Sequence, residues 1–138
     1  MEKVDKKEDT LIRDNNTVGM FRDAVYKKCL DVYGADPQID ICLEEMSELA
    51  KALLKYRRKK ALADRKDVNP VSDGVDLEKA REDIIDELAD VKVMVRQMEM
   101  LFDAEKEVDD RTGGKIIRQL GRLGVTKEEI EEEMQERH

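Results

Sequence analysis

The spacing of apolar residues is the feature that most constrains this chain. Apolar side chains recur every three or four positions over long stretches, which places them on one face of an α-helix. Prolines, which break helices, occur only at Pro37 and Pro70. No stretch alternates convincingly between polar and apolar residues, as a half-buried strand does. The sequence therefore predicts an all-α fold, and we expect four main helices packed as a bundle.

Residues that start and stop helices set the boundaries of the first two. The first helix is predicted at residues 17–33, and Gly34 ends it because glycine readily takes the left-handed conformation. The second begins with Asp36 as N-cap and Pro37 at the first helical position. It continues into the basic run 57–60, because cations are favourable near a helix C-terminus.

Similar signals delimit the second half of the chain. Residues 63–74 combine Asn, Pro, Ser and Gly, which is typical of a loop. A third helix is predicted to begin near Asp76, and a fourth to span residues 104–123. Gly124 is expected to close the fourth helix.

The predicted organisation is one helical domain with a segment at each end. Residues 1–16 are polar and weakly patterned, so we expect a flexible lead-in. The helical domain is assigned to residues 17–124. Thr126 and Glu129 have the spacing of a capping box, which predicts a short acidic tail helix within 125–138.

Composition limits the classes of partner. A net charge of −8 disfavours nucleic-acid binding, which needs a basic face. A small anionic substrate remains open, because a bound divalent cation can reverse the local field. The apolar stretches are too short to span a membrane, and the charged N-terminus does not resemble a signal peptide. With Cys29 and Cys42 interpreted as reduced thiols, we expect a cytoplasmic protein.

The histidine content limits the available chemistry. His138, the last residue, is the only histidine in the sequence. Ser-His-Asp catalysis and His-ligated zinc are therefore effectively excluded. Any catalysis must depend mainly on carboxylates, lysines, arginines or a metal ion.

Each of two predicted helices carries acidic residues at a spacing at which their charges repel one another. Glu45 and Glu48 are neighbours on the predicted second helix, as are Glu87 and Asp90 on the third. Like charges at this spacing destabilise a helix by roughly a few tenths of a kcal/mol per pair. Glu45 and Glu87 lie at the margins of their apolar stripes, where unpaired charge is costly. A divalent cation held by oxygens from both helices would relieve both penalties, which indicates a Mg²⁺ site.

The competing interpretation is that these acids form a solvated face, as charge runs usually do. Glu48 gives the strongest support for a solvated face. This residue points away from the centre of the apolar stripe and has Lys51 within reach. Spacing alone leaves both interpretations open.

The acidic segments resemble a known family. Glu44-Glu45-x-x-Glu48, followed after a loop by Glu87-x-x-Asp90, is similar to the EExxE…ExxD signature of the MazG-type all-α nucleoside triphosphate pyrophosphohydrolases. The resemblance implies a bundle that forms dimers or tetramers. It also implies Mg²⁺-dependent cleavage of a nucleoside triphosphate between the α- and β-phosphates, with Mn²⁺ as an alternative metal.

The resemblance, which covers roughly residues 34–123, also implies roles for individual residues. The metal ligands would be four acids, Glu45, Glu48, Glu87 and Asp90. Glu44 would orient or deprotonate the attacking water. The residues expected to bind substrate are Gln38, Lys55, Lys115 and Arg118. For each cation a solvated surface charge is the competing interpretation, and for Gln38 it is a structural hydrogen bond.

The chain has no tryptophan on which to stack a base, unlike some members of that family, so the preferred nucleotide does not follow.

Two further interpretations of function remain. A catalytically silent protein that binds nucleotide and metal on the same scaffold, with a regulatory role, is the main alternative. The other is a plain helical interaction module, which predicts no effect of Mg²⁺ on stability.

Overall fold

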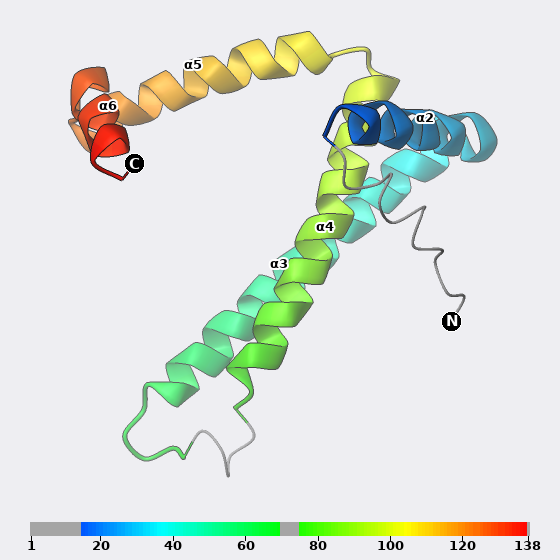
Figure 1. The fold of residues 1–138 in the computed structure, drawn as a ribbon. Helices are drawn as coiled ribbons and strands as arrows, with labels where there is room; N and C mark the ends of the chain where they lie inside the picture. The colour runs from blue at the N-terminus through cyan, green and yellow to red at the C-terminus, as the bar shows by residue number, and fades with distance from the viewer. Residues whose placement is uncertain (1–14, 70–74, 138) are drawn as a thin grey trace. The chain divides into compact units, whose positions relative to one another are not determined.

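The computed structural model describes residues 15–69 and 75–137. These residues form α-helices and no strand, so the predicted all-α class is confirmed (Figure 1). The helices are α2 (Asn15–Tyr33), α3 (Ala35–Ala63), α4 (Leu77–Leu101), α5 (Glu105–Leu123) and α6 (Lys127–Glu136). The chain divides into two compact units, Met1–Leu101 and Phe102–His138, and each is described by itself.

The junction between α2 and α3 depends on one glycine. Gly34 has a φ of 88°, and its amide donates to the carbonyl of Leu30, so Gly34 ends α2 as predicted. The predicted N-cap role of Asp36 is wrong. With Gly34 as the N-cap, α3 begins at Ala35 and Asp36 lies inside its first turn. A carboxylate there still favours the helix through the dipole.

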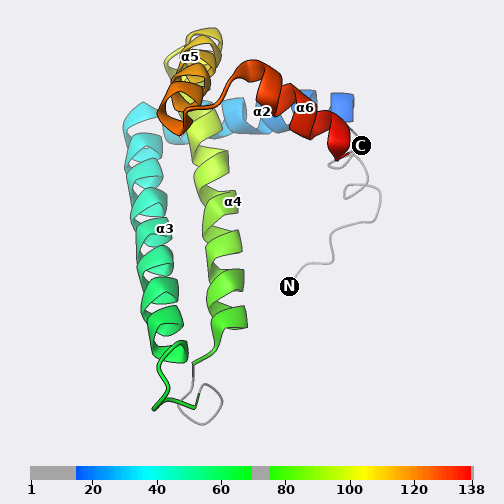
Figure 2. The ribbon, with the colours of Figure 1, turned by 90° about the vertical axis from the view of Figure 1, so that its left-hand side faces the viewer.

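In the first unit, α3 and α4 lie side by side and run in opposite directions, and both views show this (Figures 1 and 2). Helix α2 lies across the end of this pair where α3 begins and α4 ends. Asp76 starts α4, since its side chain accepts a hydrogen bond of 2.9 Å from the Lys79 amide. In the resulting hairpin, one long side of α3 faces one long side of α4.

A small core joins the hairpin. Its buried apolar residues are Cys42 on α3 and Ala80 and Met94 on α4. Two buried glutamines add a polar contact, because Gln38 Nε2 donates to Gln97 Oε1 at 2.6 Å. This hydrogen bond pairs one polar atom of each glutamine, which would be costly to bury unpaired, and links the start of α3 to the end of α4.

An ion-pair cluster attaches α2 to the hairpin. Arg96 Nη2 lies 2.8 Å from Asp23 Oδ2, and Arg96 Nη1 lies 3.1 Å from Glu99 Oε2. The two bonds from the Arg96 guanidinium to Asp23 lower the pKa of that carboxyl group. Arg96 therefore holds α2 and α4 together at this end of the hairpin.

The hairpin leaves large apolar side chains exposed. Leu43 and Leu54 on α3 are 61% and 58% exposed, and Leu88 and Val95 on α4 are 47% and 43% exposed. At about 100° per residue, the two α3 side chains share one flank of their helix, and so do the two on α4. We refer to these four residues as the apolar flanks. Such exposed apolar surface is typical of a protein contact site.

The second unit contains α5 and α6. Gly124 takes a φ of 69° and closes α5, which confirms the predicted C-terminal signal. The capping box is confirmed as well, because Thr126 Oγ1 accepts from the Glu129 amide while the Glu129 side chain accepts from the Thr126 amide. Both signals involve residues close in sequence, which is why sequence alone located them.

The finer parts of the fold prediction remain predictions. These are the bundle of four main helices, the dimer or tetramer, and the boundaries 17–124 and 125–138. Helix α2 begins two residues before the predicted position, and residues 1–14 lie outside the described part. Residues 64–69 of the predicted loop are non-helical, and 70–74 are also outside it. Among the described helices, none combines the length and apolar character needed to cross a membrane.

Candidate metal centre

Three carboxylates from two helices converge on one point of the hairpin. Glu45 comes from α3, and Glu87 and Asp90 come from α4. One oxygen from each can be chosen so that all three lie within 4.8 Å of one another. We call these three residues the acidic triad. It brings together three of the four acids predicted to bind the metal.

The positions of the triad follow from helix periodicity and from the core. Glu87 and Asp90 are three residues apart and therefore lie on one face of α4. The buried residue Met94 is one turn beyond Asp90, and the buried residue Cys42 is about one turn before Glu45. The packing that joins the two helices therefore also holds the triad at the margin of the contact.

Two acids of the triad, Glu45 and Glu87, are costly to ionise in the absence of a cation. Burial raises the pKa of Glu45, and the charges of Asp90, Glu87 and Glu44 raise it further. Burial likewise raises the pKa of Glu87, with additional contributions from Asp90, Glu48 and Asp86. Both groups thus resist ionisation in the folded protein.

One oxygen in the triad has no partner. Glu87 Oε2 is buried and makes no hydrogen bond within the described part of the chain. A buried acceptor without a donor is costly, and a cation or a water molecule bound to it would remove that cost. This orphaned oxygen is the feature of the triad that most favours a cation.

The donor set fits Mg²⁺. All three groups offer carboxylate oxygen, the ligand type that hard divalent cations prefer. Opposite ligands of one Mg²⁺ are separated by about 4.2 Å, twice the usual metal–oxygen distance. The chosen oxygens of the triad lie within 4.8 Å of one another, a limit only slightly larger than that distance. Small side-chain rotations would therefore bring Glu45, Glu87 and Asp90 to bonding distance.

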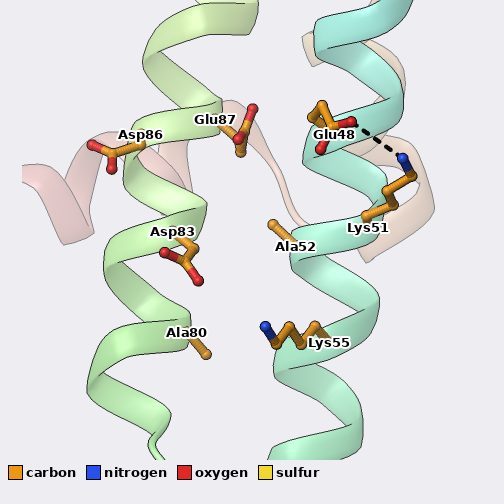
Figure 3. Close-up of a pocket in the computed structure, with 8 residues that line it drawn as sticks. All are labelled: Glu48, Lys51, Ala52, Lys55, Ala80, Asp83, Asp86 and Glu87. Atoms are coloured by element: carbon orange, nitrogen blue, oxygen red, sulfur yellow. Dashed lines mark hydrogen bonds and ion pairs between the residues drawn. The ribbon is translucent and has the colours of Figure 1, made fainter.

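Glu48 lies beside the triad. Its carboxylate forms an ion pair of 3.1 Å with Lys51, the neighbour predicted to compete for it. Glu48 and Glu87 nevertheless line one groove between α3 and α4, with a volume of about 260 Å³ (Figure 3). A metal role for Glu48, as a ligand or through water, stays a prediction.

The groove extends from Glu48 and Glu87 towards the C-terminal end of α3 (Figure 3). Ala52 and Ala80 are its apolar lining residues, and Lys55 extends from α3 towards α4 (Figure 3). The groove is therefore acidic next to the triad and contains a cation further along. The remaining lining residues are Lys51, Asp83 and Asp86.

The other predicted site residues occupy different surroundings. Glu44 is exposed next to Glu45, and its charge acts on the pKa of Glu45. Gln38 is 3% exposed and bonded to Gln97, so the structural hydrogen bond considered above is present. Lys115 and Arg118 are exposed on α5 in the second unit. Substrate contacts by these residues stay predictions.

Sequence reasoning missed some residues of this region. Asp83 and Asp86 precede Glu87 and Asp90 by one helical turn, so their spacing already placed them on the same side of α4. From the sequence alone, neither of them was assigned to the site. Gln97 was missed as well, although it lies one turn from Met94 at a position where an apolar residue is expected. A polar residue in an apolar stripe is the signal that could have identified it.

Comparisons of the chain with models of protein families, with curated proteins and with solved structures found no match. The resemblance to MazG-type pyrophosphohydrolases rests on the acidic motifs alone. The function is therefore inferred from the chemistry of the triad and the groove.

Proposed function

We propose that this chain is a Mg²⁺-dependent pyrophosphohydrolase that converts (deoxy)nucleoside triphosphates to monophosphate and pyrophosphate and so cleans the nucleotide pool. One observation carries the proposal: Glu45, Glu87 and Asp90 converge within 4.8 Å beside a groove that contains lysine. The acids occur in the order of the EExxE…ExxD signature.

The chemistry suits a protein without a usable histidine. A divalent cation in the triad would neutralise phosphate charge and lower the pKa of a bound water. The residues needed beyond the ligands are those that position phosphate and water. Lys55 lines the groove, and Glu44 is the sequence neighbour of Glu45. In this proposal Lys55 binds phosphate and Glu44 orients the water.

The apolar flanks support the proposed homodimer or homotetramer. A second copy would bury Leu43 and Leu54 or Leu88 and Val95, and each fully buried leucine contributes roughly 1.5–3 kcal/mol. The association would also complete a bundle of four long helices from two hairpins.

The test is a panel of nucleoside and deoxynucleoside triphosphates incubated with MgCl₂. Pyrophosphate and orthophosphate are measured separately, because they distinguish cleavage at the α–β bond from cleavage at the terminal phosphate. We expect pyrophosphate as the first product, released only with Mg²⁺ or Mn²⁺. The Glu48→Ala and Asp90→Ala variants should release none.

Two results would overturn this proposal. Orthophosphate as the first product would show that a bond other than the α–β bond is cleaved. Activity in both variants would show that Glu48 and Asp90 are not needed for the reaction. Tight Mg²⁺-dependent nucleotide binding without any turnover would instead support the catalytically silent regulatory protein.

A further inference from the structure

The cations beside the triad are distributed unevenly along α3. Towards the C-terminal end of the helix, Lys51 and Lys55 line the groove. Towards the N-terminal end, the same flank of α3 carries Ile41 and Glu44 and no cation. Of the cations on α3, a ligand bound at the triad therefore meets only those on the C-terminal side of the helix.

Lys55 is the better placed of the two lysines. Within the described part of the chain Lys55 has no ion-pair partner, whereas Lys51 is paired with Glu48 at 3.1 Å. The acid opposite Lys55 is also occupied, because Asp83 lies 3.3 Å from Lys79. Figure 3 shows the Lys55 amine extended across the groove towards α4. Lys55 therefore offers a charge that no described acid neutralises.

The distance along the helix suits a ligand that extends from the triad. Lys55 follows Glu48 by seven residues, or about 10 Å of helix. Side chains lean towards the N-terminus of their own helix, so the lysine stem shortens this gap. A group with several linked phosphates could contact a metal in the triad with one phosphate and the Lys55 amine with another.

We infer that Lys55 binds the β- and γ-phosphates of the substrate and then the pyrophosphate product, so that the nucleoside end lies on the Ile41 side of the triad. The inference rests on the proposed function and adds the direction in which the substrate lies. Lysine suits this role, because its ammonium is a compact charge with three donors for phosphate oxygen. The reverse direction would place the most highly charged phosphates beside Glu44.

The test measures binding of inorganic pyrophosphate by calorimetry in MgCl₂, so it does not need turnover. The Lys55→Met variant keeps the stem and loses the charge. The matched control is Lys60→Met, which removes the same charge from the same helix outside the groove. Circular dichroism checks that each variant is folded.

We expect Lys55→Met to weaken pyrophosphate binding by about 10- to 30-fold, because one charge-assisted contact is lost. Lys60→Met should change it by less than about twofold, since an exposed and distant charge is screened. Lys55→Arg should retain most of the affinity. Orthophosphate, which cannot reach from the triad to Lys55, should be affected much less than pyrophosphate.

Three results would overturn the inference. One is unchanged pyrophosphate binding in Lys55→Met, and another is equal weakening by Lys60→Met. The third is a wild-type protein that binds no pyrophosphate with Mg²⁺. The triphosphate panel reports on the proposed function separately, since turnover with any of these results would refute only the direction of the substrate.

Discussion

The acidic triad and the apolar flanks lie on the same two helices and differ in what they lack. The triad gathers Glu45, Glu87 and Asp90 at the contact between α3 and α4. The flanks, represented by Leu54 on α3 and Leu88 on α4, are separated from those acids by about 100° or more of helical rotation. Among the described residues, no cation is paired with the three acids, and no surface covers the exposed part of the flanks.

This difference indicates that each region binds a different kind of partner. A cation would stabilise the half-buried carboxylates of Glu45 and Glu87 and the exposed one of Asp90, whereas exposed leucines are stabilised by another apolar surface. A change in one region should therefore leave the partner of the other unaffected. The following predictions test that separation, from the largest effect to the smallest.

The largest effect is expected from neutral variants of the triad. Asp90→Asn or Glu87→Gln should lower pyrophosphate release by about 1,000-fold, because metal ions contribute several kcal/mol of charge stabilisation. Glu82→Gln is the matched control, since Glu82 is an exposed acid on α4 paired with Arg81. Steady-state kinetics with the best triphosphate measures the effect. Activity within threefold of wild type in both triad variants would contradict the prediction.

Metal binding should stabilise the folded protein. At an Mg²⁺ concentration of 100 times its dissociation constant, the gain is about 2.7 kcal/mol, equivalent to a rise in Tm on the order of 10 °C. Asp90→Asn should abolish the rise and leave the helical circular-dichroism signal intact, because it relieves repulsion. Differential scanning calorimetry with and without MgCl₂ is the measurement. An equal rise in Tm in the variant would show that the metal binds outside the triad.

The apolar flanks should control association. Leu88→Lys should dissociate an oligomer and remove roughly 1–1.5 kcal/mol of stability, because the assembly would cover the half of this leucine that is exposed in the single chain. Met20→Lys is the control, since Met20 is 78% exposed on α2. Sedimentation velocity and urea unfolding measure the two effects. A monomeric wild type, with a change of stability within about 0.5 kcal/mol, would show that the flanks do not associate.

The smallest effect is the pH dependence of the metal-free protein. The folded-state pKa values of Glu45 and Glu87 are raised, so the folded state binds more protons than the unfolded state just above the ordinary value of 4.5. Stability should therefore fall as pH rises through this window. The Glu45→Gln variant should show a weaker fall in Tm. A wild-type Tm that rises over the same range, relative to that variant, would contradict the electrostatic account.

Mg²⁺ should change the sign of this dependence. The cation binds ionised carboxylates, so its stabilising effect should grow as pH rises through the raised pKa values of Glu45 and Glu87. Melting in MgCl₂ and in EDTA across the same pH series separates the two trends. Parallel curves would show that metal binding is independent of these carboxylates.

Much of the fold could be predicted because its signals are local. Apolar side chains three and four residues apart indicate helices, and Gly34, Gly124 and the capping box of Thr126 with Glu129 mark their ends. The exception was Asp36. Its type and its place before Pro37 favoured an N-cap, but the conformation of Gly34 allowed α3 to begin two residues earlier.

For the site, sequence alone determined which acids share a helix face, because that depends only on the helical repeat. Glu87 and Asp90 were paired in this way. Tertiary structure decided that Glu45 joins them while Glu48 turns to Lys51. The choice depends on how far α3 and α4 are shifted along each other. That alignment is accompanied by the packing around Cys42, Ala80 and Met94 and by the Gln38–Gln97 hydrogen bond. These contacts join two segments that are distant in sequence, so the spacing of residues within one helix does not predict the alignment.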